Sequence, residues 1–275
     1  MSLTTNNRDA KTTIVCIDFD GTLVDHTGHI HPADVEILES ERSVAFVPAT
    51  GRPLHSVRRT LERHGLFVDE PIPFPLVLEN GSAVYLENEV LLARRSFEPD
   101  LQDDLMRAVR ASKETSFLLF SLDAARALRP NEDLWALVRR FDLDAQLFDT
   151  GEGLPEPLCK VGVTAEDPGD LHAFQAALAG LPLEQTYSLP NLLEVAPVGV
   201  HKGLGLTDLL EDIGSVGAEV VVVGDGENDL ALFDQATLSF APRSSPPAIQ
   251  ARADRVLDLQ KEGLLTPILR EIQTT

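Results

Sequence analysis

Residues 14–23 read IVCIDFDGTL, an apolar run that passes directly into two carboxylates one residue apart, Asp18 and Asp20. A β-branched run that ends at Asp and Gly is typical of an inner strand of a parallel sheet leading into a loop. Ligands of open α/β sheets bind just beyond the carboxyl ends of such strands. The stretch therefore predicts an α/β fold with both acids at the mouth of a site, although Asp and Gly also close ordinary turns.

The composition is that of a globular protein with an acidic surface. The chain has 275 residues, of which 43% are hydrophobic, and a formal net charge of −21 from 23 Lys and Arg against 44 Asp and Glu. Charge of this sign repels phosphate backbones, so we expect neither nucleic acid nor an anionic membrane as partner. A small anionic substrate is still compatible with it, provided that a metal and a few cations reverse the sign locally.

Several further features indicate a cytoplasmic setting. The apolar runs are too short for a membrane helix, and the first residues are polar and lack the apolar segment of a signal peptide. The two cysteines, Cys16 and Cys159, make neither a disulfide framework nor a metal-binding spacing. We therefore expect a reducing, cytoplasmic environment.

Apolar runs and helical patterns alternate at both ends of the chain. Strands are expected at residues 14–17, 44–47, 76–78, 220–223, 238–240 and 255–257. Alternating strands and helices indicate a doubly wound parallel sheet, that is, a Rossmann-like core. The middle differs, with a hairpin expected at 83–92 followed by helices at 100–112 and 131–141 and several short strands. The sequence thus predicts a core domain of residues 1–81 and 197–275 with an inserted α+β cap domain of residues 82–196.

Two further segments of the core are candidates for a binding site, one directly after a predicted strand and one at the start of a predicted helix. Thr50-Gly51-Arg52 follows the second strand and offers a hydroxyl group and backbone amides for an anion, although an ordinary turn would look the same. Lys202 heads a helical pattern, where a lysine is usually just solvated. The glycines beside it do not form a nucleotide-binding loop, because Asp208 stands where the third glycine would be.

The segment Gly224-Asp225-Gly226-Glu227-Asn228-Asp229 follows four consecutive valines. It could be a plain turn in which Asn228 or Asp229 caps the next helix. A calcium loop is excluded, because Leu230 stands at its glycine position and Ala236 at its final glutamate position. Two acids and an asparagine after a buried strand favour a magnesium site, which uses one or two carboxylates and keeps waters.

Taken in order, DFDGTL, the threonine of ATGR, the lysine of HKG and GDGEND resemble the four motifs of the haloacid dehalogenase superfamily. The insertion resembles, in size and position, the type IIB cap of the Cof-like sugar phosphatases. The runs ENG at 79–81 and EVAPVGVHKG at 194–203 are also similar to that subgroup. One segment departs from it, because residues 240–246 read FAPRSSP where many relatives have Met-Gly-Asn-Ala, so the role of this loop cannot be carried over.

The resemblance implies a phosphatase that acts on a small sugar phosphate or related phosphorylated metabolite through an aspartyl-phosphate. Asp18 would be the nucleophile, and Asp20 would be the general acid and then the general base. The implied phosphate-binding groups are Thr50, Gly51, Lys202, Asn228 and Arg52. The implied ligands of Mg²⁺ are Asp18, the backbone carbonyl of Asp20 and Asp225, with Asp229 orienting them. Arg52 is also compatible with a structural salt bridge.

Two other functions fit the same residues, a phosphomutase of this superfamily and a catalytically silent phosphosugar-binding protein. The sequence does not identify the cap residues that face the substrate, and it leaves open whether the protein is a monomer or a homodimer. Cap residues that could face the substrate are Arg126, Arg129, Lys160 and Tyr187. Histidines expected on the surface are His26, His29, His31 and His201.

Overall fold

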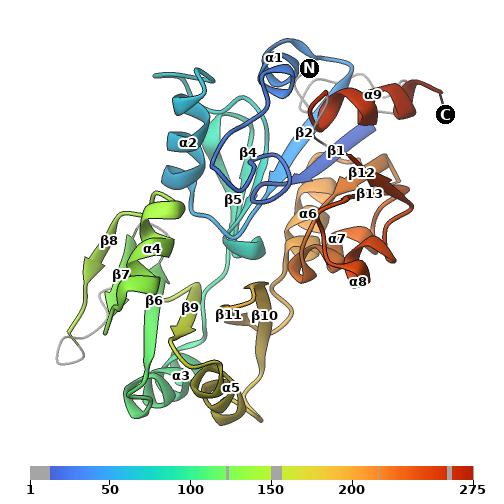
Figure 1. Cartoon of the computed structure of the whole chain (residues 1–275). Helices are drawn as coiled ribbons and strands as arrows, with labels where there is room; N and C mark the ends of the chain where they lie inside the picture. The colour runs from blue at the N-terminus through green and yellow to red at the C-terminus, as the bar shows by residue number, and fades with distance from the viewer. Residues whose placement is uncertain (1–12, 122–123, 150–156, 216, 259–261, 275) are drawn as a thin grey trace.

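The strands of the protein form two sheets, which we call the core sheet and the cap sheet (Figure 1). The structure is a computed structural model that describes residues 13–121, 124–149, 157–215, 217–258 and 262–274. Within these residues the core sheet has eight strands in the order β14-β13-β12-β1-β2-β3-β4-β5, and the cap sheet has six in the order β10-β11-β9-β6-β7-β8. The mixed α/β architecture predicted from the sequence is confirmed.

Six strands of the core sheet are parallel, and two form an antiparallel hairpin at its edge. The parallel strands are β1 (Thr13–Asp18), β2 (Val44–Ala49), β3 (Leu76–Leu78), β12 (Glu219–Val223), β13 (Leu238–Pro242) and β14 (Arg255–Leu257). From the central pair β1 and β12 the chain winds outward in opposite directions, to β2 and β3 on one side and to β13 and β14 on the other. The switch point of the sheet, where ligands of such folds bind, therefore lies between β1 and β12.

Helices cover both faces of the core sheet. One face carries α1 (Pro32–Ser40), α2 (Leu54–Arg63) and α9 (Leu265–Thr274), and the other α6 (Lys202–Asp212), α7 (Leu230–Phe233) and α8 (Pro247–Gln250). Alternate residues of β1 serve the two faces, because Val15 and Ile17 pack with the first set and Ile14 and Cys16 with the second. A central strand that is buried on both faces explains the continuous apolar run at its position in the sequence.

The hairpin expected at 83–92 is present as β4 (Ala83–Leu86) and β5 (Val90–Arg94), but it belongs to the core sheet. The register pairs Leu76 with Tyr85 and Leu78 with Ala83, and Val84 packs in the same cluster as Leu206 of α6. The predicted entrance to the cap at residue 82 is therefore wrong, and the chain leaves the core sheet only after Arg94. The rest of the division into core and cap domains stays a prediction.

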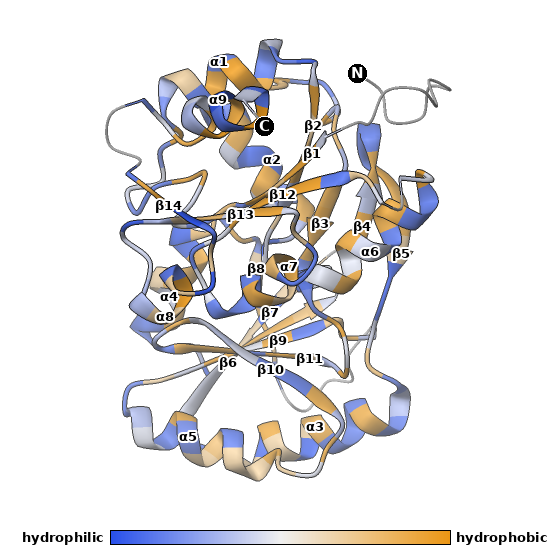
Figure 2. Cartoon of the chain, turned by 90° about the vertical axis from the view of Figure 1, so that its right-hand side faces the viewer, coloured by the Kyte–Doolittle hydropathy of each residue, from blue (hydrophilic) through white to orange (hydrophobic). Residues whose placement is uncertain are grey.

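The cap sheet is antiparallel except for the pair β7 and β8. Its strands are β6 (Thr115–Ser121), β7 (Ala124–Leu128), β8 (Ala145–Leu147), β9 (Lys160–Ala165), β10 (Leu183–Leu189) and β11 (Leu192–Pro197). Two helices, α3 (Pro99–Ala111) and α5 (Pro168–Ala177), lie side by side on the face that points away from the core sheet (Figure 2). The opposite face, with Leu118 and Phe120 of β6, packs partly against α4 (Glu132–Arg140).

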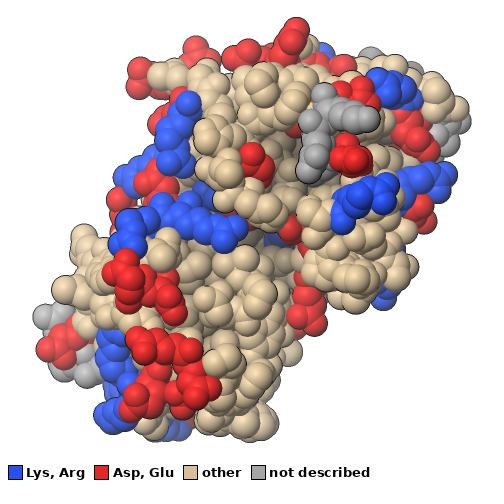
Figure 3. All heavy atoms as spheres, in the orientation of Figure 1, with Lys and Arg blue, Asp and Glu red and all other residues tan. Residues whose placement is uncertain are grey.

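Short helical turns also lie at the junctions, namely η1 (Glu79–Gly81), η2 (Glu87–Glu89) and η3 (Glu227–Asp229). Within the described residues, no helix combines the length and the apolar character needed to cross a membrane. On the face drawn in Figure 3, acidic side chains are spread widely, whereas Lys and Arg gather beside α2 and α4, where the two parts of the molecule meet.

Candidate active site

Acidic side chains from two neighbouring strands meet at the switch point of the core sheet. Asp18 is the last residue of β1, and Asp225 lies in the loop that follows β12. Together with Asp229 of η3 they offer carboxylate oxygens that all lie within 4.8 Å of one another. Because β1 and β12 are parallel neighbours, their carboxyl ends share one edge of the sheet, and this explains how Asp18 and Asp225, 207 positions apart, come together.

Lys202, the first residue of α6, joins two of these acids. Its Nζ donates to Asp18 Oδ1 at 2.6 Å and to Asp229 Oδ1 at 2.7 Å, and the lysine is only 1% exposed. The other oxygen of Asp229 accepts hydrogen bonds from the backbone N–H groups of Asp225 and Gly226, both at 3.0 Å. Asp229 thus holds both the lysine and the acidic loop, and the orienting role toward a metal that the resemblance implies for it stays a prediction.

The close packing of buried acids in this cluster changes the pKa values of its members. Desolvation, followed by the charge of Asp229, raises the pKa of Asp18 well above its ordinary range despite Lys202. The same two causes, in the same order, raise the pKa of Asp225 to about 7. Desolvation lowers the pKa of Lys202, but the charges of Asp18 and Asp229 raise it by more. Removing either acid would leave the lysine with one carboxylate partner.

The cluster fits a divalent cation with oxygen ligands. Asp18 Oδ2 is buried and has no hydrogen-bond partner among the described residues, although such atoms are nearly always paired in native proteins. Asp225 presents a second carboxylate beside it. Both oxygens of Asp229 are already used by Lys202 and the loop amides, so Asp18 and Asp225 are the better direct ligands. Magnesium is typically bound through one or two carboxylates in this manner.

Asp20 lies on the other side of the turn and is held by Arg52. The guanidinium donates from Nε to Asp20 Oδ2 at 2.8 Å and from Nη2 to Asp20 Oδ1. Arg52 is 5% exposed, donates to Thr60 Oγ1 at 2.9 Å and lies between the rings of Phe19 and Phe141. The structure therefore places Arg52 in the salt bridge that the sequence allowed as an alternative, with its guanidinium engaged by Asp20 instead of free for an anion.

The remaining predicted residues surround the same place. Thr50 and Gly51 follow β2, the neighbour of β1, and the Thr50 side chain accepts from the N–H of Arg52 at 3.2 Å. Asn228 of η3 donates to Asn80 Oδ1 at 3.4 Å. Thr50, Gly51 and Asn228 line one cavity with Asp18, Asp20 and Asp225. Lys202 lies directly behind Asp18.

A charged cluster connects the cap sheet to this site, and of its members the sequence named only Lys160, as one of four cap residues that could face the substrate. Lys160 of β9 is 2% exposed, and its Nζ donates to the Gly51 carbonyl and, at 2.6 Å, to Glu194 Oε1 of β11. Glu194 in turn accepts from Asn80 at 2.9 Å, and Glu79 Oε2 lies 3.5 Å from the lysine. The available signal was a lysine inside an apolar strand, because a buried charge needs a partner.

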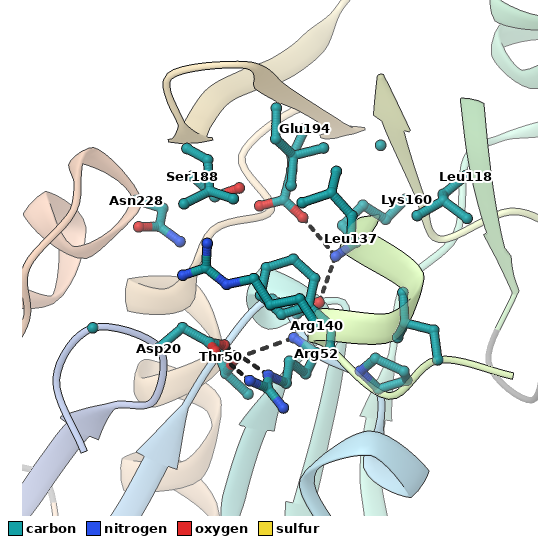
Figure 4. A pocket seen from close by; sticks show the side chains of 18 of the residues that line it. Asp20, Thr50, Arg52, Leu118, Leu137, Arg140, Lys160, Ser188, Glu194 and Asn228 are labelled. Atoms are coloured by element: carbon teal, nitrogen blue, oxygen red, sulfur yellow. Dashed lines mark hydrogen bonds and ion pairs between the residues drawn. The ribbon is translucent and has the colours of Figure 1, made fainter. Parts of the chain in front are cut away.

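Core and cap together enclose a cavity of about 210 Å³ above the acids (Figure 4). The core side contributes the polar loop residues, and the cap side contributes mainly leucine and phenylalanine side chains. In Figure 4 the Arg140 side chain, from the end of α4, reaches across this cavity toward Asn228 and Ser188. Of the four cap candidates, Lys160 lines this cavity, and the sequence did not predict Arg140 as a lining residue.

The other residues considered from the sequence lie elsewhere. Tyr187 donates to Gln175 at 3.1 Å, and Arg129 donates to the backbone carbonyls of Thr115 and Val109 on the α3 side of the cap sheet. Neither they nor Arg126 nor residues 240–246 are among the described residues that line the cavity.

The four histidines also differ among themselves. His31 and His201 are half-buried and cap α1 and α6, where each Nδ1 accepts a backbone N–H. His26 and His29 are exposed, as expected, but His26 also lines the cavity.

Comparison with known proteins gives a consistent result. Residues 15–266 match the family described as haloacid dehalogenase-like hydrolase. An uncharacterised hydrolase of Schizosaccharomyces pombe is 28% identical, over 94% of this chain and 90% of its own length. The 5-amino-6-(5-phospho-D-ribitylamino)uracil phosphatase YcsE of Bacillus subtilis is 23% identical, over 98% of both chains.

Solved structures share the fold. TM0651 of Thermotoga maritima superposes with a TM-score of 0.80 at 24% identity, over 94% of this chain and 97% of that one. The subclass IIB sugar phosphatase BT4131 superposes with a TM-score of 0.77 at 18% identity, over 96% of this chain and all of that one. At these identities the likeness concerns the fold, including the presence of both sheets.

Proposed function

Since the chain belongs to the family of haloacid dehalogenase-like hydrolases, we propose that it is a Mg²⁺-dependent phosphatase that cleaves a small sugar phosphate or related metabolite through an aspartyl-phosphate. The observation that carries this proposal is the convergence of Asp18, Asp225 and Lys202 beneath the cavity between the two sheets. A carboxylate nucleophile, an acid that binds a metal and a fixed lysine are groups that covalent phosphoryl transfer uses.

Asp18 is the proposed nucleophile. It lines the cavity, and the hydrogen bond from Lys202 fixes the direction of its carboxylate. Its attack on phosphorus would form an acyl-phosphate as the bond to the leaving alkoxide breaks, and water would then release phosphate and restore Asp18. Covalent catalysis of this kind divides one difficult hydrolysis into two easier steps.

Asp20 is the proposed general acid and base. It lines the same cavity, and its side chain is 25% exposed, so that both a leaving group and a water can reach it. The two hydrogen bonds from Arg52 fix its carboxylate. Asp20 would give a proton to the leaving oxygen and then take one from the attacking water, which requires one side chain to serve both half-reactions.

The phosphoryl oxygens would be bound by Thr50, the Gly51 amide, Lys202 and Asn228. Each lies at the carboxyl edge of the core sheet, and three of them line the cavity. Donors fixed before the reaction stabilise the transferring group without reorganisation. Mg²⁺ would be held by Asp18, Asp225 and the Asp20 backbone carbonyl, and its charge would offset the negative charge that gathers on the phosphoryl group.

Similar proteins support phosphate esters as the substrate class. YcsE is named as a phosphatase of a phosphorylated ribitylaminouracil, and BT4131 as a sugar phosphatase. Both names describe a phosphate monoester on a small metabolite. The cavity of about 210 Å³ is of a size for part of such a molecule, and the acidic surface argues against polymeric phosphate substrates.

The test is phosphate release from p-nitrophenyl phosphate and from a panel of phosphorylated metabolites, with Mg²⁺ and with EDTA. We expect release that stops with EDTA and that Asp18→Asn abolishes without loss of the folded state. Asp234→Asn is the matched control, because Asp234 is exposed and pairs with Arg252 at 2.7 Å. Retention of a tenth of the activity in Asp18→Asn would exclude Asp18 as the nucleophile. An isomerised ester without free phosphate would indicate a mutase, and binding without turnover a silent binding protein.

A further inference from the structure

The cations around the cavity differ in whether a carboxylate already neutralises them. Lys202 is bound by Asp18 and Asp229, Arg52 by Asp20, and Lys160 by Glu194. These three are buried, and Arg52 and Lys160 line the cavity while Lys202 contacts Asp18. Their charge is largely offset by the protein's own acids, so that, apart from the phosphoryl contact proposed for Lys202, they have limited capacity to hold a further anionic group of a substrate.

Arg140 is different, because none of the described carboxylates forms an ion pair with it. It is exposed at the end of α4, lines the cavity, and has its guanidinium carbon 5.5 Å from the centre of the Phe141 ring. The adjacent Arg139 does form a pair, with Glu132 at 2.5 Å. A guanidinium that extends into a cavity with no carboxylate partner among the described residues can offer its N–H donors to a ligand that enters.

The direction of the Arg140 side chain indicates which part of a substrate it meets. Figure 4 shows it crossing the cavity from the cap toward Asn228 and Ser188, above Asp20. The phosphoryl group is proposed to lie on the core side, against Asp18 and Thr50. Arg140 therefore comes from the side on which the leaving group must lie.

The wall beside Arg140 is apolar. The cavity's cap side is formed largely by Leu118, Phe120, Leu137, Phe141, Leu143 and Leu192. The polar cap side chains Lys160 and Glu194 are bonded to each other. A leaving group with a hydroxyl on every carbon would leave several of them unpaired against this wall, which costs free energy. A flat or apolar body would bury its surface there.

From these observations we propose that Arg140 determines the specificity of the enzyme by binding a carbonyl or carboxylate oxygen on a largely apolar leaving group. This inference rests on the proposed phosphatase activity and, of the substrates proposed above, selects the related metabolites over the sugar phosphates. Arg140 also lines a second, more open hollow with Arg63 and Arg139, where Figure 3 shows basic side chains gathered. The acceptor group would thus lie near a basic opening, which favours its approach.

The test compares three phosphate esters that differ in the leaving group. Phenyl phosphate has a flat body without an acceptor, 3-carboxyphenyl phosphate adds a carboxylate, and glucose 6-phosphate has a polyol body. We expect kcat/KM of the native enzyme to be highest for 3-carboxyphenyl phosphate. Arg140→Met should lower that value by about 10- to 100-fold, mainly through KM, as expected for one charge-assisted hydrogen bond. Phenyl phosphate should change by no more than about twofold.

Arg139→Met is the matched control on the same helix turn, and it should keep the native preference. A uniform loss with all three esters in Arg140→Met would overturn the inference, because it would indicate a contact to the phosphoryl group. An unchanged preference for the carboxylate in Arg140→Met would overturn it as well, while the proposed function would stand. If the native enzyme releases phosphate from none of the three esters or the metabolite panel, the proposed function itself fails and the inference fails with it.

Discussion

Gly21 leaves space for the Asp225 carboxylate, because it has no Cβ. Replacing it by alanine should weaken Mg²⁺ binding, and this effect can be measured separately from the effect on the free energy of unfolding. A Cβ built on Gly21 would lie 2.1 Å from Asp225 Oδ2, whereas non-bonded carbon and oxygen atoms normally stay more than about 3 Å apart. The carboxylate would thus have to move by about 1 Å, more than the roughly 0.5 Å that a functional site tolerates. Gly21→Ala should therefore displace one of the two carboxylates proposed as direct ligands of Mg²⁺.

The backbone at Gly21 adds a second cost, and the chain offers a control for it. Gly21 has φ of +87°, a conformation that costs an L-residue about 1–2 kcal/mol. Gly28 has the same φ of +87°, but a Cβ built there meets nothing within 4 Å. Gly21→Ala and Gly28→Ala should thus share the backbone strain, about 1–2 kcal/mol in the free energy of unfolding, and differ in the clash with Asp225.

The assay is phosphatase activity as a function of Mg²⁺ concentration, together with calorimetric Mg²⁺ binding and urea unfolding. We expect Gly21→Ala to need about 10- to 100-fold more Mg²⁺ than the native enzyme, in line with the effect of displacing groups around a metal. Gly28→Ala should titrate like the native enzyme. If both variants bind Mg²⁺ with the native affinity, Asp225 is not a ligand in the arrangement described, and the proposed metal site is refuted.

Three further predictions concern single side chains. Asp20→Asn should slow phosphoenzyme formation by about 10²- to 10⁴-fold in single-turnover kinetics, and an unchanged rate would reject its role toward the leaving group. Lys160→Met should lower the free energy of unfolding by about 3–5 kcal/mol, because it leaves the buried Glu194 carboxylate unpaired. Adding Glu194→Gln to Lys160→Met should restore most of the lost free energy of unfolding. A double variant that is no more stable than Lys160→Met alone would contradict the explanation. Desolvation raises the pKa of Glu79 from 4.5 to about 7, with Lys160 opposing and Glu194 adding to the rise. The stability from this shift is present below the unfolded pKa and is lost as the pH rises through 7. In the native protein the free energy of unfolding should therefore fall between about pH 5 and pH 8, and in Glu79→Gln this fall should be smaller by up to about 3 kcal/mol. An identical fall in the native protein and in Glu79→Gln would contradict the raised pKa of Glu79.

The central strands of the core sheet, β1, β2, β3 and β12, could be predicted from the sequence because they are buried on both faces. Such strands read as continuous apolar runs, as in the four valines before Gly224, and need no information from the rest of the chain. The hairpin at 83–94 was predicted from its alternation, but alternation does not say which sheet a hairpin joins. That depends on the pairing of Leu76 with Tyr85, which the local sequence does not encode.

The sequence did not predict helix α1 or strand β7, because neither has a strong local pattern. Helix α1 buries an acid, Asp34, which accepts from the backbone N–H groups of Leu264 and Leu265 at 2.8 and 2.7 Å. A polar residue on the buried side weakens the amphipathic pattern, and its partners lie about 230 residues away. Strand β7 reads AARAL and lacks the β-branched residues that mark strands.

For the site, the sequence predicted the groups that follow strands, whereas in the cap it named Lys160 only as one of four candidates and missed Arg140, because these positions depend on how the cap lies over the core. Asp18 and Asp225 come together because the topology places parallel strand ends at one edge. Lys160 and Arg140 reach the cavity from the cap, and only the packing of the two sheets brings them there. Lys160 belongs to a strand and Arg140 to the end of a helix, and these positions in the sequence do not indicate which core residues lie across the cavity from them.

The charges at the sheet edge explain why a protein with a net charge of −21 can accept a phosphate ester at all. The carboxylates there number four and the cations in contact with them two, among the described residues: Asp18, Asp20, Asp225, Asp229, Lys202 and Arg52. With all acids ionised, the excess of two negative charges equals the charge of one divalent cation. Without that cation, a phosphate dianion could enter only against the repulsion of ionised acids or after proton uptake by Asp18 and Asp225, whose pKa values are raised by desolvation and by the charge of Asp229. In the proposed mechanism Mg²⁺ would therefore favour substrate binding as well as the phosphoryl transfer, and EDTA should raise KM as well as lower kcat.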